Sequence, residues 1–160
     1  YIYMSIPFFK LFLSILPFVS IFIIGYYYSP SKQILLQKPI FQPPSWVFSI
    51  IWTYITISFG YISVDALYTL PNKKIIFLFY SIILILLNLW LIVNSNKRVK
   101  EGFYILLATS YISILYLMYL SSKLYKNTIY LIILPFWLIV ATCLNGVIYN
   151  NISQKYAVKV

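Results

Sequence analysis

The chain offers few residues that can perform acid–base or metal chemistry. It contains no histidine, and Asp65 and Glu101 are the 2 acidic residues among its 160 residues. Because these acids fall near opposite ends of different apolar segments, a carboxylate dyad, a catalytic triad and a histidine metal site all lack their parts. The 1 cysteine, Cys143, cannot form an internal disulfide or a cysteine cluster. The sequence therefore predicts no catalytic residues, no metal site and no required cofactor.

The sequence also contains few ionisable residues that could support charge-coupled transport. Proton relays and ion sites normally place ionisable groups inside a helix bundle, and Asp65 is the sole candidate. Since Asp65 lies near the end of its apolar segment, we expect it at the membrane interface rather than in a relay.

The chain is instead rich in aromatic side chains, which make up 21% of its residues and include 4 tryptophans. Trp52 and Trp137 each fall well inside an apolar segment, where an indole N–H needs a partner and usually faces protein or a cavity. At helical spacing Trp52 shares one face with Phe48. Trp137 shares another face with Ala141 and Leu144. Two such faces either line an apolar pocket for a flat or rigid ligand or pack helix against helix, and the spacing leaves both readings open.

The elements that carry these residues are predicted to be membrane-spanning helices. With 62% hydrophobic and 9% charged residues, the chain cannot cover a soluble surface, whereas a lipid-facing exterior removes that requirement. Its continuous apolar runs lack the alternation of an outer-membrane barrel and approach the ~20 residues that cross a bilayer. We expect an all-α membrane protein, a single domain over residues 1–160 built as a bundle of five transmembrane helices. The predicted spans are about 8–28, 46–68, 75–95, 103–122 and 128–150.

The 12 basic residues give a formal net charge of +10, but they stand singly or in small groups between the apolar runs. That placement is typical of membrane flanks, so membrane lipid is an expected partner and nucleic acid is not. The two sides of the predicted bundle differ only slightly in their number of basic residues. The side with more of them holds the loop from Ser29 to Ser45 and the C-terminus, and the positive-inside rule places that side in the cytosol. The stretch from Leu11 to Tyr28 is interpreted as a retained helix, with a signal peptide as the alternative.

The first connection, from Ser29 to Ser45, is the longest and cannot form a regular interior helix because it contains Pro39, Pro43 and Pro44. Such a loop either caps a cavity or serves as an interfacial connector. The segment K-P-I-F-Q-P-P-S-W-V-F at its end covers residues 38–48. A second block, W-L-I-V-A-T-C-L-N-G-V-I-Y, covers residues 137–149. Together these blocks resemble signatures of the translocator protein family, also called the tryptophan-rich sensory proteins.

A third and shorter block, Leu87-Asn88 leading to Gly102-Phe103, is similar to the same family. The resemblance implies a protein that is often a homodimer, with a ligand pocket in the loop-side half of the bundle beneath the first loop. Trp90 is displaced by one position from a family tryptophan. Carried over by motif position, the expected ligand contacts are Pro43, Pro44, Phe48, Trp52, Asn88, Phe103, Trp137, Ala141 and Leu144.

The resemblance also supplies the functional hypotheses. Family members bind porphyrins and sterols, so the leading hypothesis is a membrane-embedded binding protein that senses, sequesters or transports such small hydrophobic ligands. Haem would lack a histidine axial ligand here, which makes a metal-free porphyrin the simpler guess. The alternatives are a membrane enzyme that degrades porphyrin and a structural adaptor whose pocket has decayed. The resemblance places the protein in the mitochondrial outer membrane of a eukaryote or the cell envelope of a bacterium.

Overall fold

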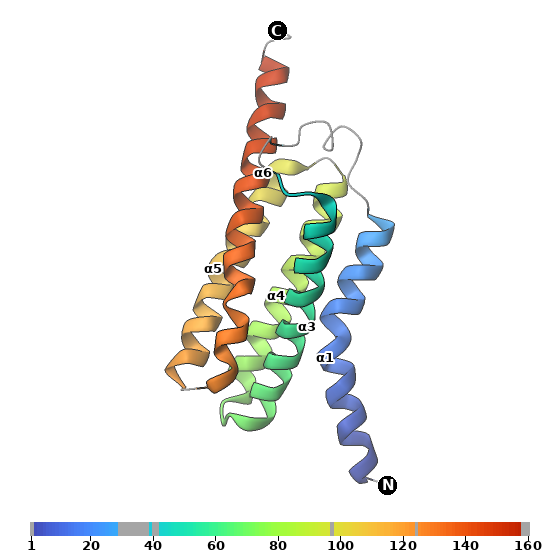
Figure 1. The fold of residues 1–160 in the computed structure, drawn as a ribbon, viewed down its shortest axis with the longest axis vertical. Coiled ribbons are helices and arrows are strands. Elements are labelled where there is room, and N and C mark those ends of the chain that lie inside the picture. The colour runs from blue at the N-terminus through green and yellow to red at the C-terminus, as the bar shows by residue number, and fades with distance from the viewer. Residues whose placement is uncertain (1, 29–38, 40–41, 97, 124, 158–160) are drawn as a thin grey trace.

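The computed structural model describes residues 2–28, 39, 42–96, 98–123 and 125–157, with side chains described between residues 8 and 154. Over these ranges the chain forms five long α-helices and one short 3-10 helix (Figure 1). In chain order they are α1 (Ile2–Tyr27), α3 (Ser45–Thr69), α4 (Lys73–Ser95), α5 (Val99–Ser122), the 3-10 helix η1 (Lys126–Leu131) and α6 (Ile133–Ala157). The described residues hold 5 spans long and apolar enough to cross a membrane, which confirms the predicted fold class.

The helices differ from the predicted spans mainly at their ends. α1 begins at Ile2 rather than near residue 8, and α6 continues to Ala157 rather than ending near residue 150. A single helix from residue 128 would place Pro135 in its interior, where proline has no N–H to donate and its ring clashes with the preceding turn. The chain instead forms η1 and starts again at Ile133, so that Pro135 lies in the first turn of α6.

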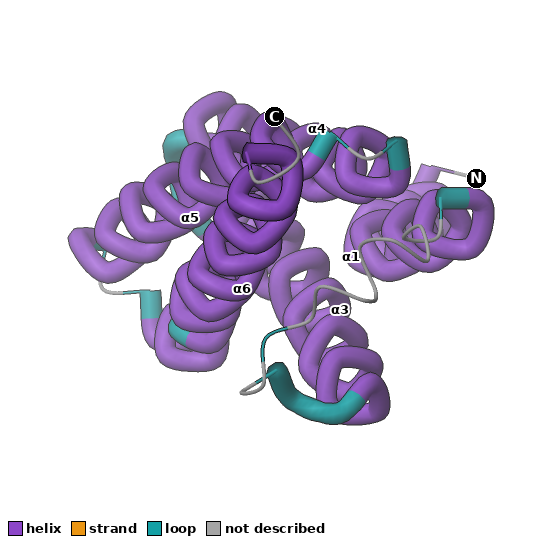
Figure 2. Tube along the Cα trace, turned by 90° about the horizontal axis from the view of Figure 1, so that it is seen from above, coloured by secondary structure: helices purple, strands orange, loops and turns teal. Residues whose placement is uncertain are grey.

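The five helices run alternately up and down, with the N-terminus of α1 at one end and the C-terminus of α6 at the other (Figure 1). α1 stands at the margin of the bundle against α3 and α4, while α6 packs chiefly on α5 (Figure 2). The C-terminal end of α1, the start of α3, the end of α4 and the start of α5 share one end of the bundle. We call this the loop end, because the first loop joins the bundle there.

The packed core lies among α3, α4, α5 and α6. At its centre Phe59 of α3 stacks on Tyr80 of α4, with ring centroids 5.4 Å apart, and both side chains are buried. Large apolar side chains such as Phe12 and Phe22 of α1 are exposed on the outside of the bundle. That pattern suits a lipid exterior, since lipid rather than water would cover these side chains.

One close backbone approach and a hydrogen bond from Tyr80 are among the contacts that hold α1 against the bundle. A Cβ atom on Gly60 of α3 would lie 2.0 Å from the carbonyl oxygen of Ser14, so only glycine lets the two backbones meet here. Pro17 has no N–H for the carbonyl of Leu13, which an ordinary residue at that position would satisfy. The Tyr80 hydroxyl donates to this carbonyl at 2.7 Å and so replaces the lost helical bond.

Candidate ligand-binding site

A cavity of about 250 Å³ lies between α1, α3 and α4 near the loop end. Gly25 is close to the end of α1, Phe48 is close to the start of α3, and Trp90 is close to the end of α4. These three positions fix the cavity in the loop-side half of the bundle. Its described lining consists of Ile21, Gly25, Phe48, Ser49, Trp52, Leu87, Trp90 and Leu91.

Aromatic rings from three helices meet beside this cavity. Trp52 of α3 and Trp90 of α4 stack with their centroids 5.7 Å apart and their planes 20° apart. Phe48 meets Trp137 of α6 edge to face, with centroids 5.2 Å apart. Both arrangements are favourable for aromatic pairs. Phe48 and Trp52 are one turn apart on α3, and we call these two aromatic pairs together the aromatic wall.

Three of the predicted ligand contacts, Phe48, Trp52 and Trp137, therefore come together at the aromatic wall. Asn88 is half-buried on α4 and forms a hydrogen bond to α1, because its Nδ2 donates to the Ser20 hydroxyl at 3.2 Å. Its Nδ2 also donates to a carbonyl of its own helix. The predicted contact residue Asn88 thus borders the same α1–α4 interface as the cavity.

The other predicted contacts occupy different surroundings. Phe103 of α5 packs against α6, since its ring lies 3.1 Å from the Cβ position of Gly146. Ala141 and Leu144 are each 5% exposed on α6 and do not belong to the described lining of the cavity. Both side chains are buried within the bundle, and their contact with a ligand stays a prediction.

Pro43 and Pro44 immediately precede α3. Pro43 is half-buried and Pro44 is exposed, and the Pro44 carbonyl accepts a hydrogen bond from the Val47 N–H at 3.0 Å. Pro44 is thus the N-cap residue of α3. The expected cap formed by the rest of that loop lies outside the described residues, at positions 29–38, 40 and 41.

Several buried polar atoms near this site have no hydrogen-bond partner within the described part of the chain. A buried donor or acceptor without a partner costs about 1–3 kcal/mol, so each one calls for a physical explanation. The atoms concerned are Asn88 Oδ1, Trp90 Nε1, Asn94 Oδ1, Trp137 Nε1 and Asn145 Oδ1.

Apart from the neighbouring Asn88, the α4 residues that line the cavity were not predicted as ligand contacts, although the sequence carries a signal for them. Leu87, Trp90, Leu91 and Asn94 have the spacing i, i+3, i+4 and i+7, which places them along one face of a helix. The structure turns the first three of them toward the cavity. The pattern alone does not show which neighbouring helix this face meets, so Trp90 was not connected with Trp52.

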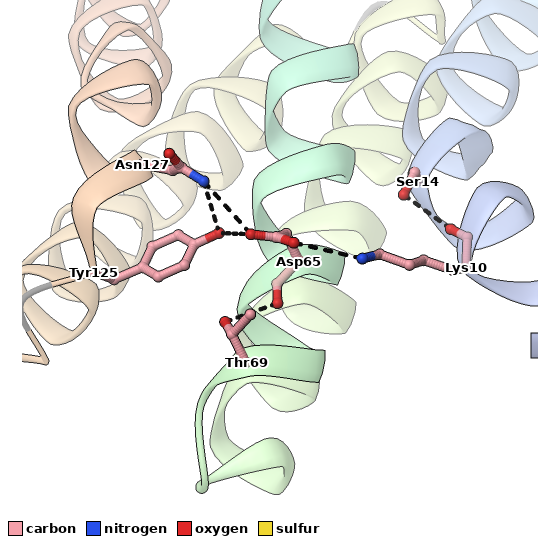
Figure 3. Close-up of polar contacts among 6 residues, drawn as sticks. All are labelled: Lys10, Ser14, Asp65, Thr69, Tyr125 and Asn127. Atoms are coloured by element: carbon pink, nitrogen blue, oxygen red, sulfur yellow. Dashed lines mark hydrogen bonds and ion pairs between the residues drawn. The ribbon is translucent and has the colours of Figure 1, made fainter. Parts of the chain in front are cut away.

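The opposite end of the bundle holds a separate polar network around Asp65 (Figure 3). Its carboxylate accepts a hydrogen bond from the Tyr125 hydroxyl and lies 3.4 Å from the ammonium of Lys10 and 3.5 Å from the amide of Asn127. Burial raises the pKa of Tyr125, and the hydrogen bond to Asp65 raises it further, so the hydroxyl remains a donor at ordinary pH. The network ties α1, α3 and the start of η1 together, away from the cavity.

The described residues hold five helices that are long and apolar enough to cross a membrane, which defines an integral, multi-pass membrane protein. Residues 13–150 match the model of the TspO/MBR family. The match covers well over half of the chain, and the chain therefore belongs to this family, as its motifs had suggested. No curated protein matches the chain.

Proposed function

We propose that the protein binds a tetrapyrrole or a sterol beside the aromatic wall and so acts in the sensing, sequestration or transport of that ligand. The observation that carries the proposal is the stacked pair of Trp52 and Trp90, which lines the cavity. A flat macrocycle or a fused ring system buries much apolar area against such rings without losing internal freedom. Membership of the TspO/MBR family supports the same ligand classes.

The size and openness of the cavity suggest how the ligand would lie. Its volume of about 250 Å³ is just below the ~300–1,000 Å³ of typical small-molecule sites. The cavity therefore suits one edge of a large ring system, with the remainder directed outward. A Cβ on Gly25 would have no heavy atom within 4 Å, which leaves the α1 side of the cavity open. Entry between α1 and α4 from the lipid would suit an apolar ligand.

The chain contains no histidine, so the commonest protein ligand of haem iron is missing. Stacking on the aromatic wall requires no metal. A metal-free porphyrin is accordingly the simplest tetrapyrrole for this site and the first one to test.

The proposal is tested by titrating porphyrins and sterols, side by side, into the purified protein in nanodiscs. Tryptophan fluorescence reports binding, because a porphyrin close to an indole quenches its emission. We expect saturable quenching by protoporphyrin, reduced by each of Trp52→Phe, Trp90→Phe and Trp137→Phe. Trp46→Phe is the matched control, since Trp46 is 64% exposed and lies outside the described lining.

The comparison among these variants separates a site from simple partitioning. If the ligand lies in the cavity, the four substitutions should reduce quenching unequally, with the largest reductions for Trp52→Phe and Trp90→Phe. Equal losses from all four substitutions, or quenching that rises with lipid content without saturating, would show that the ligand dissolves in the bilayer and would reject the proposal.

A further inference from the structure

A second cavity, of about 400 Å³, lies between α3 and η1. It is on the other side of α3 from the aromatic wall, because Tyr54 follows Trp52 by two positions and so lies about 200° away from it around the helix. We call this cavity the tyrosine groove. Its described lining consists of Tyr54, Ser58, Tyr61, Ile62, Asn127 and Tyr130.

The tyrosine groove opens to the outside of the bundle. Tyr54 is 40% exposed, Tyr61 is 56% exposed and Tyr130 is 59% exposed. Ser58 is half-buried and lies close to the middle of α3, a helix of 25 residues. A helix of this length crosses the membrane, so the groove faces the hydrocarbon interior, and an occupant would enter it from the lipid.

Four hydroxyl groups around the tyrosine groove have no hydrogen-bond partner within the described part of the chain. The three phenols belong to exposed residues and the Ser58 hydroxyl keeps accessible surface, so an occupant of the groove can reach them. Water is absent at this depth of a membrane, and an unpaired hydroxyl there is costly. The four hydroxyls belong to Tyr54, Ser58, Tyr61 and Tyr130.

A single exposed tyrosine does not by itself indicate a ligand. Tyr111 lies in the middle of α5, is 64% exposed and is outside the lining of the groove. The tyrosine groove differs because hydroxyls from two segments of the chain surround one space. A serine hydroxyl can turn back to a carbonyl of its own helix, but a phenol is held too far from the backbone to do so. The phenols of the groove therefore need an acceptor from outside the chain.

The surroundings of the groove favour a neutral occupant. Its described lining holds no charged side chain. Asn127 connects the lining to Asp65, since the amide Nδ2 lies 3.5 Å from the carboxylate. That carboxylate already has Lys10 and Tyr125 as partners. The other bases at this end of the bundle are exposed and outside the lining, namely Lys73, Lys74, Lys123 and Lys126. An ionised group inside the groove would therefore lack a counter-charge.

The polar atoms of the occupant should be acceptors. Each of the four hydroxyls has a proton to donate, whereas Asn127 adds only its Oδ1 as a further acceptor, because its Nδ2 is directed to Asp65. Hydroxyls also accept, but a carbonyl oxygen pairs with them without bringing a donor that needs a partner of its own. A flat ring can in addition stack on the tyrosine rings. A quinone combines a neutral flat ring, two carbonyl oxygens and an apolar tail.

We infer that the tyrosine groove is a second binding site, for a neutral, lipid-soluble compound that carries carbonyl acceptors on a flat ring, the class to which the quinones belong. The hydroxyls of the groove donate to the carbonyl oxygens, and the apolar tail extends into the lipid. The site is separate from the aromatic wall and does not depend on the function proposed for it.

The experiment uses two probes, decylnaphthoquinone and decylnaphthalene, which share the ring skeleton and the tail and differ in the two carbonyl groups. Each is titrated into the full chain in nanodiscs of ether-linked phosphatidylcholine. Binding is the amount of probe retained in excess of empty nanodiscs with the same lipid content, which removes general partitioning. We expect saturable binding of the quinone, with one site per chain, and no saturable binding of the hydrocarbon.

Hydroxyl substitutions locate the quinone. Tyr61→Phe and Tyr130→Phe keep the rings and should each weaken its binding by about 2–10-fold, the range of one net hydrogen bond. Tyr111→Phe is the matched control, since it removes an exposed phenol at similar depth outside the groove, and it should leave the affinity unchanged. Ser58→Leu fills the groove on a lipid-facing side of α3, so the chain should fold while saturable binding is lost.

The lipid linkage identifies the source of the carbonyl group. Ester carbonyls of phospholipids lie near the headgroups, above the middle of α3, so the affinity for the quinone should be the same in ester-linked and ether-linked nanodiscs. A clearly weaker affinity in ester-linked nanodiscs would show that phospholipid esters occupy the groove and would overturn its assignment to a free carbonyl compound.

Two further outcomes would overturn the second site without touching the function proposed for the aromatic wall. One is the absence of saturable quinone binding in a protein that still binds protoporphyrin. The other is saturable quinone binding that protoporphyrin displaces and that survives Tyr61→Phe, Tyr130→Phe and Ser58→Leu, which would place the quinone at the aromatic wall. Conversely, quinone binding that the groove variants weaken in a protein without protoporphyrin binding would reject the proposed function and keep the second site.

Discussion

The contact between α1 and α3 at Gly60 allows the sharpest stability prediction, for the substitution Gly60→Ala. The added Cβ would lie 2.0 Å from the Ser14 carbonyl oxygen and 3.1 Å from Pro17 Cδ. A relaxed carbon–oxygen contact needs about 3.3 Å, so the two backbones must move apart by roughly 1 Å. Overpacking of this kind costs about 1–3 kcal/mol, while alanine recovers up to about 1 kcal/mol of helix propensity. We therefore expect a net loss of up to about 2 kcal/mol.

The assay is thermal unfolding in nanodiscs, with Gly25→Ala as the matched control. A Cβ on Gly25 of α1 would have no heavy atom within 4 Å, so this variant gains the same propensity without a clash. For a chain of this size each kcal/mol corresponds to about 2–4 °C in Tm. We expect Gly60→Ala to melt several degrees below Gly25→Ala. Equal melting temperatures would refute the close approach of α1 and α3 at Gly60.

Three other perturbations test the remaining contacts. Tyr80→Phe leaves the Leu13 carbonyl without its donor, so thermal unfolding should show a loss of about 1–2 kcal/mol, and an unchanged Tm would mean that this carbonyl is satisfied otherwise. Asp65→Asn removes the ion pair with Lys10, whose ammonium is partly exposed. The loss of stability should therefore be below about 1 kcal/mol and should shrink at high salt. A larger loss that does not depend on salt would assign the stability to the Tyr125 contact instead. In a Cys143→Ser background, cysteines that replace Lys100 and Gln154 should react with an impermeant thiol reagent from one side of the membrane, and a cysteine that replaces Lys74 should react from the other side. Labelling of positions 100 and 154 from opposite sides would exclude the five-helix topology.

Much of the fold follows from hydropathy, because a membrane span requires a long apolar run and the described residues contain five such runs. The ends of the helices were less predictable. The break before α6 depends on the position of Pro135 relative to the helix start, and the C-terminal extension of α6 depends on packing of Ile148, Tyr149 and Ile152 near Val99. Hydropathy records neither effect.

The aromatic part of the site was predictable where a single helix carries the pattern. Phe48 and Trp52 share a face of α3, and that face does reach the cavity. Trp90 was missed because its role depends on the neighbouring helix that its face meets, which is a property of the bundle and not of α4. For the same reason the spacing did not show that Ala141 is buried within the bundle.

The hydrogen bonds between distant helices were also beyond the sequence patterns. Asp65 was expected at the membrane interface, and it lies near the end of α3 as expected, but its partners Lys10 and Tyr125 are more than 50 residues away along the chain. Tyr80 completes the bond that Pro17 cannot make. Such pairings follow only from the order in which the helices surround one another.

We propose that the ligand binds beside the stacked pair of Trp52 and Trp90. The most direct measurement is protoporphyrin quenching of a variant that keeps only these two tryptophans, made by Trp46→Phe and Trp137→Phe, in nanodiscs of varied lipid content. We predict saturable quenching with one porphyrin per chain and an affinity that does not depend on the amount of lipid. The reciprocal variant, Trp52→Phe with Trp90→Phe, should lose most of this saturable signal. Saturable quenching that is retained by the reciprocal variant and absent from the first would show that the ligand binds elsewhere.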